Sequence, residues 1–241
     1  MLKKAVAILL VAIIAVGLVF ADTDTDQGER PETLAEKFSY AFGIYLLLNY
    51  EDSAMNALYY YQSQVYPEIN DYFGYLGMYE FSMDTCPYSL DELNDFLTDY
   101  LSDYEERMAA KSAENLKIAE VFLKENKTKA GVKTTASGLQ YKIIKQGTGA
   151  KATADDSVEL DYELKLLSGD VIDSSYARGE HSTFPMSGVI EGFREGVMLM
   201  PMGSHYIFYI HPDLGYGSQA TGGMEPNSLL IFEVETYSIV K

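Results

Sequence analysis

The stretch that decides the fold of the C-terminal half is Ser157-Val-Glu-Leu-Asp-Tyr-Glu-Leu-Lys-Leu166. Its apolar residues Val158, Leu160, Tyr162 and Leu164 alternate with charged ones. Successive side chains of a strand point to opposite faces, so this spacing gives one apolar and one charged face. The pattern predicts a β-strand with one face buried.

Further strands are predicted on both sides of this stretch, between clusters of Gly, Pro and Asp. They are Gly138–Ile144, Ser204–Ile210 and Leu229–Tyr237. The run from Gly192 to Met200 has helical spacing and stops at Pro201. An antiparallel sheet with one short helix packed on a face is the simplest arrangement of these elements.

The N-terminal half has a helical pattern instead. Apolar residues recur at helical spacing after Pro31, which suits a first helical turn: Leu34, Phe38, Phe42, Tyr45 and Leu48. Ser89 and Glu92 form a capping box at the start of a second helix. The apolar stripe of that helix is Leu93, Leu97, Tyr100, Tyr104 and Met108, and it weakens over 111–116. A helix from about 90 to 129 would be roughly 60 Å long, so we expect part of its stripe to meet another chain or the first helix.

The segment 50–88 is rich in tyrosine and admits two interpretations. One is an aromatic surface for a partner or client chain. The other is ordinary packing, in which the ring is buried and the hydroxyl stays in water.

The first 21 residues have the pattern of a secretory signal peptide. Lys3 and Lys4 precede an uncharged apolar run from Ala5 to Phe20, and an acidic segment begins at Asp22. This predicts cleavage before Asp22 and an exported protein, with the periplasm as its destination. The alternatives are an uncleaved segment that anchors the chain in the membrane, and a location on the cell surface.

Composition narrows the chemistry further. The chain of 241 residues has 36 acidic and 18 basic residues, a formal charge of −18, which argues against nucleic acid as a partner. Cys86 is the single cysteine, so an intrachain disulfide is excluded. The histidines His181, His205 and His211 lack the spacing of metal ligands, and no glycine-rich phosphate loop occurs. We therefore expect neither a metal nor a cofactor.

An ordered set of motifs resembles the FKBP-type peptidyl-prolyl cis-trans isomerases. The set is Ser137–Gly149, Asp173-Ser-Ser175, Val189-Ile-Glu-Gly-Phe193, Leu199-Met-Pro-Met-Gly203, Leu214-Gly-Tyr-Gly217 and Pro226–Phe232. Upstream, 37–43 and 121–133 are similar, more loosely, to the helical dimerisation half of Mip-like members (macrophage infectivity potentiator type).

The resemblance implies an α+β protein. Its parts would be a signal peptide at 1–21, an all-helical dimerisation domain at 22–88, a long connecting helix at 89–130 and an isomerase domain at 131–241. The last would be an antiparallel β-sheet wrapped around a short helix. The implied function is an exported peptidyl-prolyl cis-trans isomerase that assists the folding of periplasmic or surface proteins as a homodimer.

The resemblance also assigns site residues. Asp173, Tyr216 and Phe193 would be catalytic, with Phe193 as the floor under the proline ring and Asp173 near the reacting carbonyl, oriented by Arg178. The Tyr216 hydroxyl and the Ile190 N–H would hold the flanking carbonyls of an X-Pro polypeptide. The remaining substrate-binding residues would be Tyr162, Ile172, Arg178, Val189, Ile190 and Phe232.

Several positions depart from the family pattern. Ile172 stands where an aromatic is usual, Phe193 replaces the commoner tryptophan, Leu164 stands where glycine is preferred, and 217–226 is one residue short and lacks the usual pocket aromatic or histidine. Losing one aromatic wall removes about 1–2 kcal/mol of ring burial. We expect a slow or selective isomerase that binds macrolide inhibitors weakly. The alternative is a non-catalytic chaperone or adhesin on the same scaffold.

Overall fold

The computed structural model describes residues 30–50 and 53–240. The predicted signal peptide at 1–21 lies outside these residues. In the described part, no helix is long and apolar enough to cross a membrane. Packing divides the chain into two units after Glu106, and each is considered by itself below.

Unit 1 is helical. It contains α2 (Leu34–Tyr50), α3 (Ala54–Gln64), α4 (Asp71–Ser82) and the first part of α5 (Leu90–Asn126). The predicted capping box at the start of α5 is present, since the Glu92 carboxylate accepts from Ser89 N at 2.8 Å and Ser89 Oγ accepts from Glu92 N at 3.2 Å.

The start of α2 differs from the expectation. Pro31 precedes the helix and is not in its first turn. A capping box of Thr33 and Glu36 begins the helix instead: Glu36 Oε2 accepts from Thr33 N at 3.0 Å, and Thr33 Oγ1 accepts from Glu36 N at 3.2 Å. Reciprocal bonding of two otherwise unpaired N–H groups fixes the helix start more strongly than the backbone preference of proline.

Glycine brings α2 and α4 into direct backbone contact. A Cβ on Gly43 would lie 2.1 Å from the carbonyl oxygen of Gly74, and one on Gly77 would lie 2.2 Å from that of Tyr40. Only residues without a side chain fit at these two positions. The crossing places Phe38 and Tyr40 in the interior of unit 1, fully buried.

The tyrosine-rich segment contributes to both packing and surface. Tyr66 packs its ring against Phe38, Phe42 and Tyr100, with ring centroids 5.3–6.2 Å apart. Tyr59 and Tyr60, by contrast, are 52% and 60% exposed. Tyr66 thus fits the packing interpretation, while Tyr59 and Tyr60 lie at the surface.

Unit 2 is built on an antiparallel seven-stranded sheet, and the predicted α+β class is confirmed. The strand order is β1-β2-β6-β7-β3-β4, with β5 paired to β3. The strands are β1 (Val132–Thr134), β2 (Gln140–Lys145), β3 (Ser157–Lys165), β4 (Val171–Ser174), β5 (Ser182–Pro185), β6 (His205–Ile210) and β7 (Leu230–Val240). The other elements of unit 2 are α6 (Ser175–Arg178), α7 (Glu191–Leu199) and the 3-10 turns η2 (Met186–Gly188) and η3 (Pro212–Leu214).

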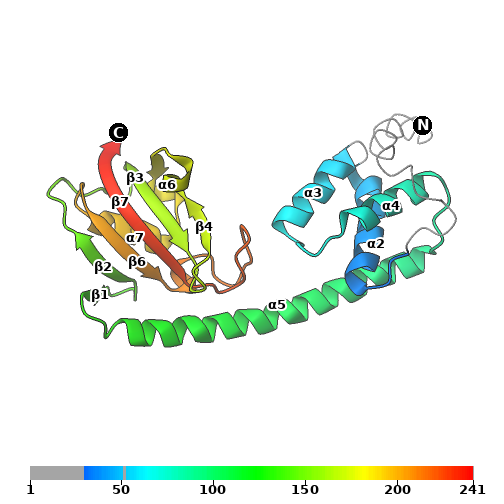
Figure 1. Cartoon of the computed structure of the whole chain (residues 1–241), viewed down its shortest axis with the longest axis horizontal. Helices are drawn as coiled ribbons and strands as arrows, with labels where there is room; N and C mark the ends of the chain where they lie inside the picture. Colours follow the sequence, from blue (N-terminus) through cyan, green and yellow to red (C-terminus); the bar gives the residue numbers. More distant parts are fainter. Residues whose placement is uncertain (1–29, 51–52, 241) are drawn as a thin grey trace. The chain divides into compact units, whose positions relative to one another are not determined.

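Helix α7 packs on one face of this sheet (Figure 1). The approach is close, since a Cβ on Gly196 would lie 2.7 Å from the Phe208 ring. The alternating residues of β3 named above, Val158, Leu160, Tyr162 and Leu164, are all buried in this core. Phe193 and Val197 of α7 complete it from the helix side.

The end of α5 belongs to unit 2 and is fixed there by polar contacts. Buried Asn126 donates to Gln140 Oε1 at 3.0 Å, and Gln140 donates to the Leu123 carbonyl at 2.8 Å. Earlier in the helix, Asn227 donates to Ser112 Oγ at 2.8 Å, and Asn115 donates to the Pro226 carbonyl at 3.0 Å. These bonds explain why the apolar stripe weakens over 111–116, where the helix meets a turn through polar groups.

Candidate active site

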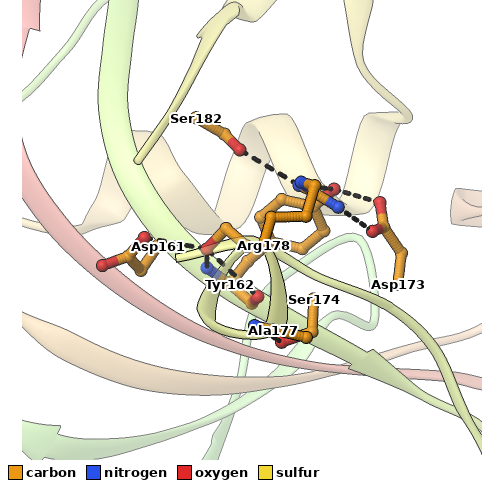
Figure 2. A network of polar contacts seen from close by, with 8 residues as sticks. Asp161, Tyr162, Asp173, Ser174, Ala177, Arg178 and Ser182 are labelled. Atoms are coloured by element: carbon orange, nitrogen blue, oxygen red, sulfur yellow. Dashed lines mark hydrogen bonds and ion pairs between the residues drawn. The ribbon is translucent and has the colours of Figure 1, made fainter. Parts of the chain in front are cut away.

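Three side chains predicted for the site meet at one edge of the sheet. Tyr162 comes from β3, Asp173 from β4 and Arg178 from the end of α6. The Tyr162 hydroxyl and Arg178 Nη1 both donate to the Asp173 carboxylate, and Arg178 Nη2 donates to the Tyr162 hydroxyl at 3.2 Å. Figure 2 shows the guanidinium over the Tyr162 ring, between Asp173 and Ser182.

The local sequence explains how α6 presents Arg178. Ser174 Oγ caps the helix by accepting from Ala177 N at 3.3 Å. Gly179 closes it with φ of 73°, a left-handed conformation that favours glycine. A single helical turn between these two residues brings Arg178 back over β3.

The electrostatics of these three residues support one protonation state. Burial opposes the charge of Asp173, but hydrogen bonds from Tyr162 and Arg178 outweigh it and hold the pKa of Asp173 below its ordinary value. Burial, and then the bond to Asp173, raises the pKa of Tyr162. Asp173 is therefore an anion and Tyr162 a neutral donor at neutral pH.

Next to them lies a cluster of aromatic rings. Phe193 lies 4.8 Å from Phe232 and 6.4 Å from Tyr162, measured between ring centroids. Phe184 of β5 joins the cluster, 5.4 Å from Tyr162 and 6.1 Å from Phe193. The sequence analysis missed Phe184; its only signal is one apolar residue between Thr183 and Pro185.

Three further predicted residues lie around this cluster. Ile172, Val189 and Ile190 pack against the core and are partly buried. Tyr216, the fourth, is 43% exposed and is not part of the buried core. Within the described residues, neither the Tyr216 hydroxyl nor the Ile190 N–H forms a hydrogen bond.

Unit 2 also has a hollow away from these rings. A shallow hollow of about 470 Å³ shares no residue with the aromatic cluster; it is lined by Glu114, Lys117, Ile118, Val121, Phe122, Glu125 and Leu167. Over residues 30–50 and 53–240, no group of three His, Cys, Asp or Glu is arranged to hold a metal ion.

Two protein-family descriptions match this chain. Residues 148–237 match the FKBP-type peptidyl-prolyl cis-trans isomerases, and residues 35–143 match the domain amino-terminal to FKBP-type peptidyl-prolyl isomerases. The first region contains every predicted site residue. The second covers α3, α4, α5 and all but the first residue of α2.

Curated relatives are bacterial. The FKBP-type peptidyl-prolyl cis-trans isomerase FkpA of Aeromonas hydrophila is 43% identical over 155 residues, covering 63% of this chain and 58% of the relative. The isomerase Mip of Coxiella burnetii is 44% identical, covering 53% and 56%. The outer membrane protein MIP of Legionella longbeachae is 40% identical, covering 63% and 65%. The matched region thus spans less than two thirds of each of these relatives.

Two solved structures are similar to this chain as well. A peptidyl-prolyl isomerase from Pseudomonas syringae pv. tomato is 30% identical, with a TM-score of 0.51, over 54% of this chain and 96% of that one. FkpA from Escherichia coli is 27% identical, with a TM-score of 0.57, over 83% and 94%. This chain belongs to the FKBP-type peptidyl-prolyl cis-trans isomerase family, and it is similar to the FkpA and Mip members of that family.

Proposed function

We propose that the chain is an exported peptidyl-prolyl cis-trans isomerase that acts on X-Pro bonds of folding polypeptides. The observation that carries the proposal is the aromatic cluster of Tyr162, Phe184, Phe193 and Phe232, flanked by a fixed carboxylate. Apolar ring faces suit a proline ring, and the family assignment points to the same substrate.

The chemistry needs only the chain's own groups. Rotation about a peptide bond costs about 18–20 kcal/mol because resonance is lost. A site that excludes water stabilises the twisted amide relative to the planar one, which water solvates better. Phe193 would lie under the proline ring, while the free Ile190 N–H and Tyr216 hydroxyl would hold the flanking carbonyls.

In this mechanism Asp173 acts at the reacting carbonyl. Its carboxylate, anchored by Tyr162 and Arg178, is a fixed negative charge at the rim of the cluster. As the amide twists, its carbonyl carbon becomes more electron-poor, and a preorganised anion near it lowers the barrier. Ile172 in place of an aromatic leaves one wall of the site smaller, so we propose a slow or selective enzyme that binds macrolides weakly.

Location and assembly are part of the proposal. The N-terminal 21 residues would direct export to the periplasm, and the outer-membrane name of the Legionella relative supports a destination beyond the cytoplasm. Unit 1 would join two copies of the chain. Supporting this, α2 and α3 expose large apolar side chains, among them Leu48 at 55% and Tyr60 at 60%.

The test is cis/trans exchange of short X-Pro peptides, measured by NMR with residues 22–241. Asp173→Ala should lower kcat/KM about tenfold or more, as expected when one preorganised electrostatic group is lost. Asp155→Ala, which removes an exposed acid elsewhere in unit 2, is the matched control and should leave the rate unchanged. Thermal melts establish that both variants are folded. No acceleration by the wild-type chain over several X residues would reject the proposed activity.

A further inference from the structure

One edge of strand β3 is not paired with another strand at Asp161 and Tyr162, and Tyr162 belongs to the site. Along its other edge β3 pairs with β7 from Ser157 to Lys165, with one shift of register between Glu159 and Leu160. On the site edge, β5 pairs with Ser157–Leu160 and β4 pairs with Glu163–Lys165. Asp161 and Tyr162 fall between them, with no strand opposite within the described residues.

A buried serine takes the place of the missing strand. Ser175 has no exposed surface, and its Oγ accepts a hydrogen bond from Tyr162 N at 2.9 Å. The same hydroxyl donates to Asp161 Oδ1 at 2.8 Å. The backbone of Tyr162 is therefore connected through Ser175 to the carboxylate of its own neighbour.

The second carboxylate oxygen of Asp161 is also occupied. The Tyr237 hydroxyl of β7 donates to Oδ2 at 2.7 Å, and His181 Nδ1 lies 2.9 Å from it. Asp161 is only 7% exposed, and these partners more than offset the cost of burying its charge, so its pKa lies below the ordinary value. It is a buried anion with a complete set of partners.

The arrangement holds both ends of one segment. Ser175 begins α6, and His181 directly precedes Ser182, which accepts from Arg178 Nη2 at 3.2 Å. Asp161 therefore binds the start and the end of the segment 175–181. Arg178, which orients Asp173, lies between these two anchors.

We infer that Asp161 is a positioning residue for the isomerase site. It sets the backbone of Tyr162 through Ser175, and it sets the placement of Arg178 by holding the segment 175–181 at both ends. It contacts no substrate. The inference rests on the proposed function for its effect on rate, while its effect on the Tyr162 backbone can be measured without any activity.

The variants are Asp161→Ala, Asp161→Asn and Ser175→Ala, with Glu159→Gln as the matched control. Glu159 lies two residues earlier on the same face of β3 and accepts from Ser238 at 2.9 Å, away from the site. Asparagine keeps an oxygen that can accept from Ser175, so it should partly rescue what alanine loses. Loss of one such hydrogen bond is expected to cost about tenfold in rate.

We expect kcat to fall about tenfold in Asp161→Ala and Ser175→Ala with KM little changed, because Phe184, Phe193 and Phe232 stay in place under the proline ring. Asp161→Asn should lie between alanine and wild type, and Glu159→Gln should match wild type. Amide hydrogen exchange at Tyr162 should be fastest in Asp161→Ala and Ser175→Ala and slower in Asp161→Asn. It should be slowest in Glu159→Gln and wild type.

Two results would overturn the inference. One is a wild-type kcat together with a protected Tyr162 amide in Asp161→Ala. The other is a rate loss that follows only the folded fraction in thermal melts, without rescue by asparagine, which would make the role merely structural. An inactive wild-type chain would reject the proposed function instead, and amide exchange would still decide the positioning role.

Discussion

Ile172 is the position at which the resemblance leads us to expect an aromatic side chain and this chain has an aliphatic one. It is a partly buried aliphatic side chain next to Asp173, packed against the core beside the aromatic cluster. An aromatic ring there would add apolar surface on the side where a proline ring is proposed to bind. The position is at the edge of the core, so extra volume can extend toward solvent.

Ile172→Phe should therefore raise kcat/KM toward X-Pro peptides. A gain of about tenfold corresponds to roughly 1.4 kcal/mol of added ring contact. NMR exchange with the peptide series used for wild type measures it. Val171→Phe, at the exposed neighbouring position, controls for nonspecific stickiness. An unchanged or lower rate in Ile172→Phe would show that this wall does not limit the enzyme.

Sequence reasoning named five residues that the fold does bring together. They are Tyr162, Asp173, Arg178, Phe193 and Phe232, and their roles stay a prediction. It missed Phe184 and the contacts of Asp161. Phe184 and the contacts of Asp161 depend on which segments lie opposite β3. Neither the periodicity nor the spacing of the sequence tells which side chain binds the unpaired part of that strand.

At the level of elements, the crossing of α2 and α4 depends on the absence of a side chain at Gly43 and Gly77. Gly77→Ala would place a methyl group 2.2 Å from the Tyr40 carbonyl oxygen, far inside van der Waals contact. Because both partners are backbone, the helices must move apart. Overpacking of this kind costs about 1–3 kcal/mol or more.

We expect Gly77→Ala to lower the unfolding midpoint of unit 1 in a denaturant titration followed by tyrosine fluorescence. The control is Asn56→Ala, an exposed helical position on α3 where alanine is favourable. Isomerase activity on short peptides should survive in both variants, since all the proposed site residues are in unit 2. Equal midpoints for Gly77→Ala and wild type would contradict the close crossing.

Element boundaries were predictable where side chains cap the helix. The Ser89–Glu92 box begins α5 as expected, and Thr33–Glu36 has the same pattern and begins α2 after Pro31. The end of α5 was less predictable. It falls at Asn126, earlier than the expected end near 129, and there the buried Asn126 amide pairs with Gln140 of β2.

For the whole molecule, the property to test is the proposed self-association through unit 1. Leu48 and Tyr60 are large, exposed and apolar or aromatic, and they sit on neighbouring helices. The double variant Leu48→Glu/Tyr60→Glu should convert a dimer into a monomer in sedimentation velocity, because burying two carboxylates at an interface is unfavourable. Val121→Glu, at an exposed position in unit 2, is the control for added charge.

The same experiment separates assembly from catalysis. Exchange of a short X-Pro peptide should be equal in the monomeric variant and in wild type, whereas assistance to a folding protein client should weaken when two sites are no longer joined. A wild-type chain that sediments as a monomer at micromolar concentration would contradict the proposed role of unit 1.

The buried pair of Asn126 and Gln140 also determines how the enzyme can be cut. A chain trimmed to begin at the first strand of the sheet would leave Gln140 with no partner in the interior and would uncover Leu229, which packs against Ala119 and Leu123. The shortest autonomous catalyst therefore has to retain the final turns of α5. In a digest, we expect the persistent fragment to start inside that helix, well before Val132.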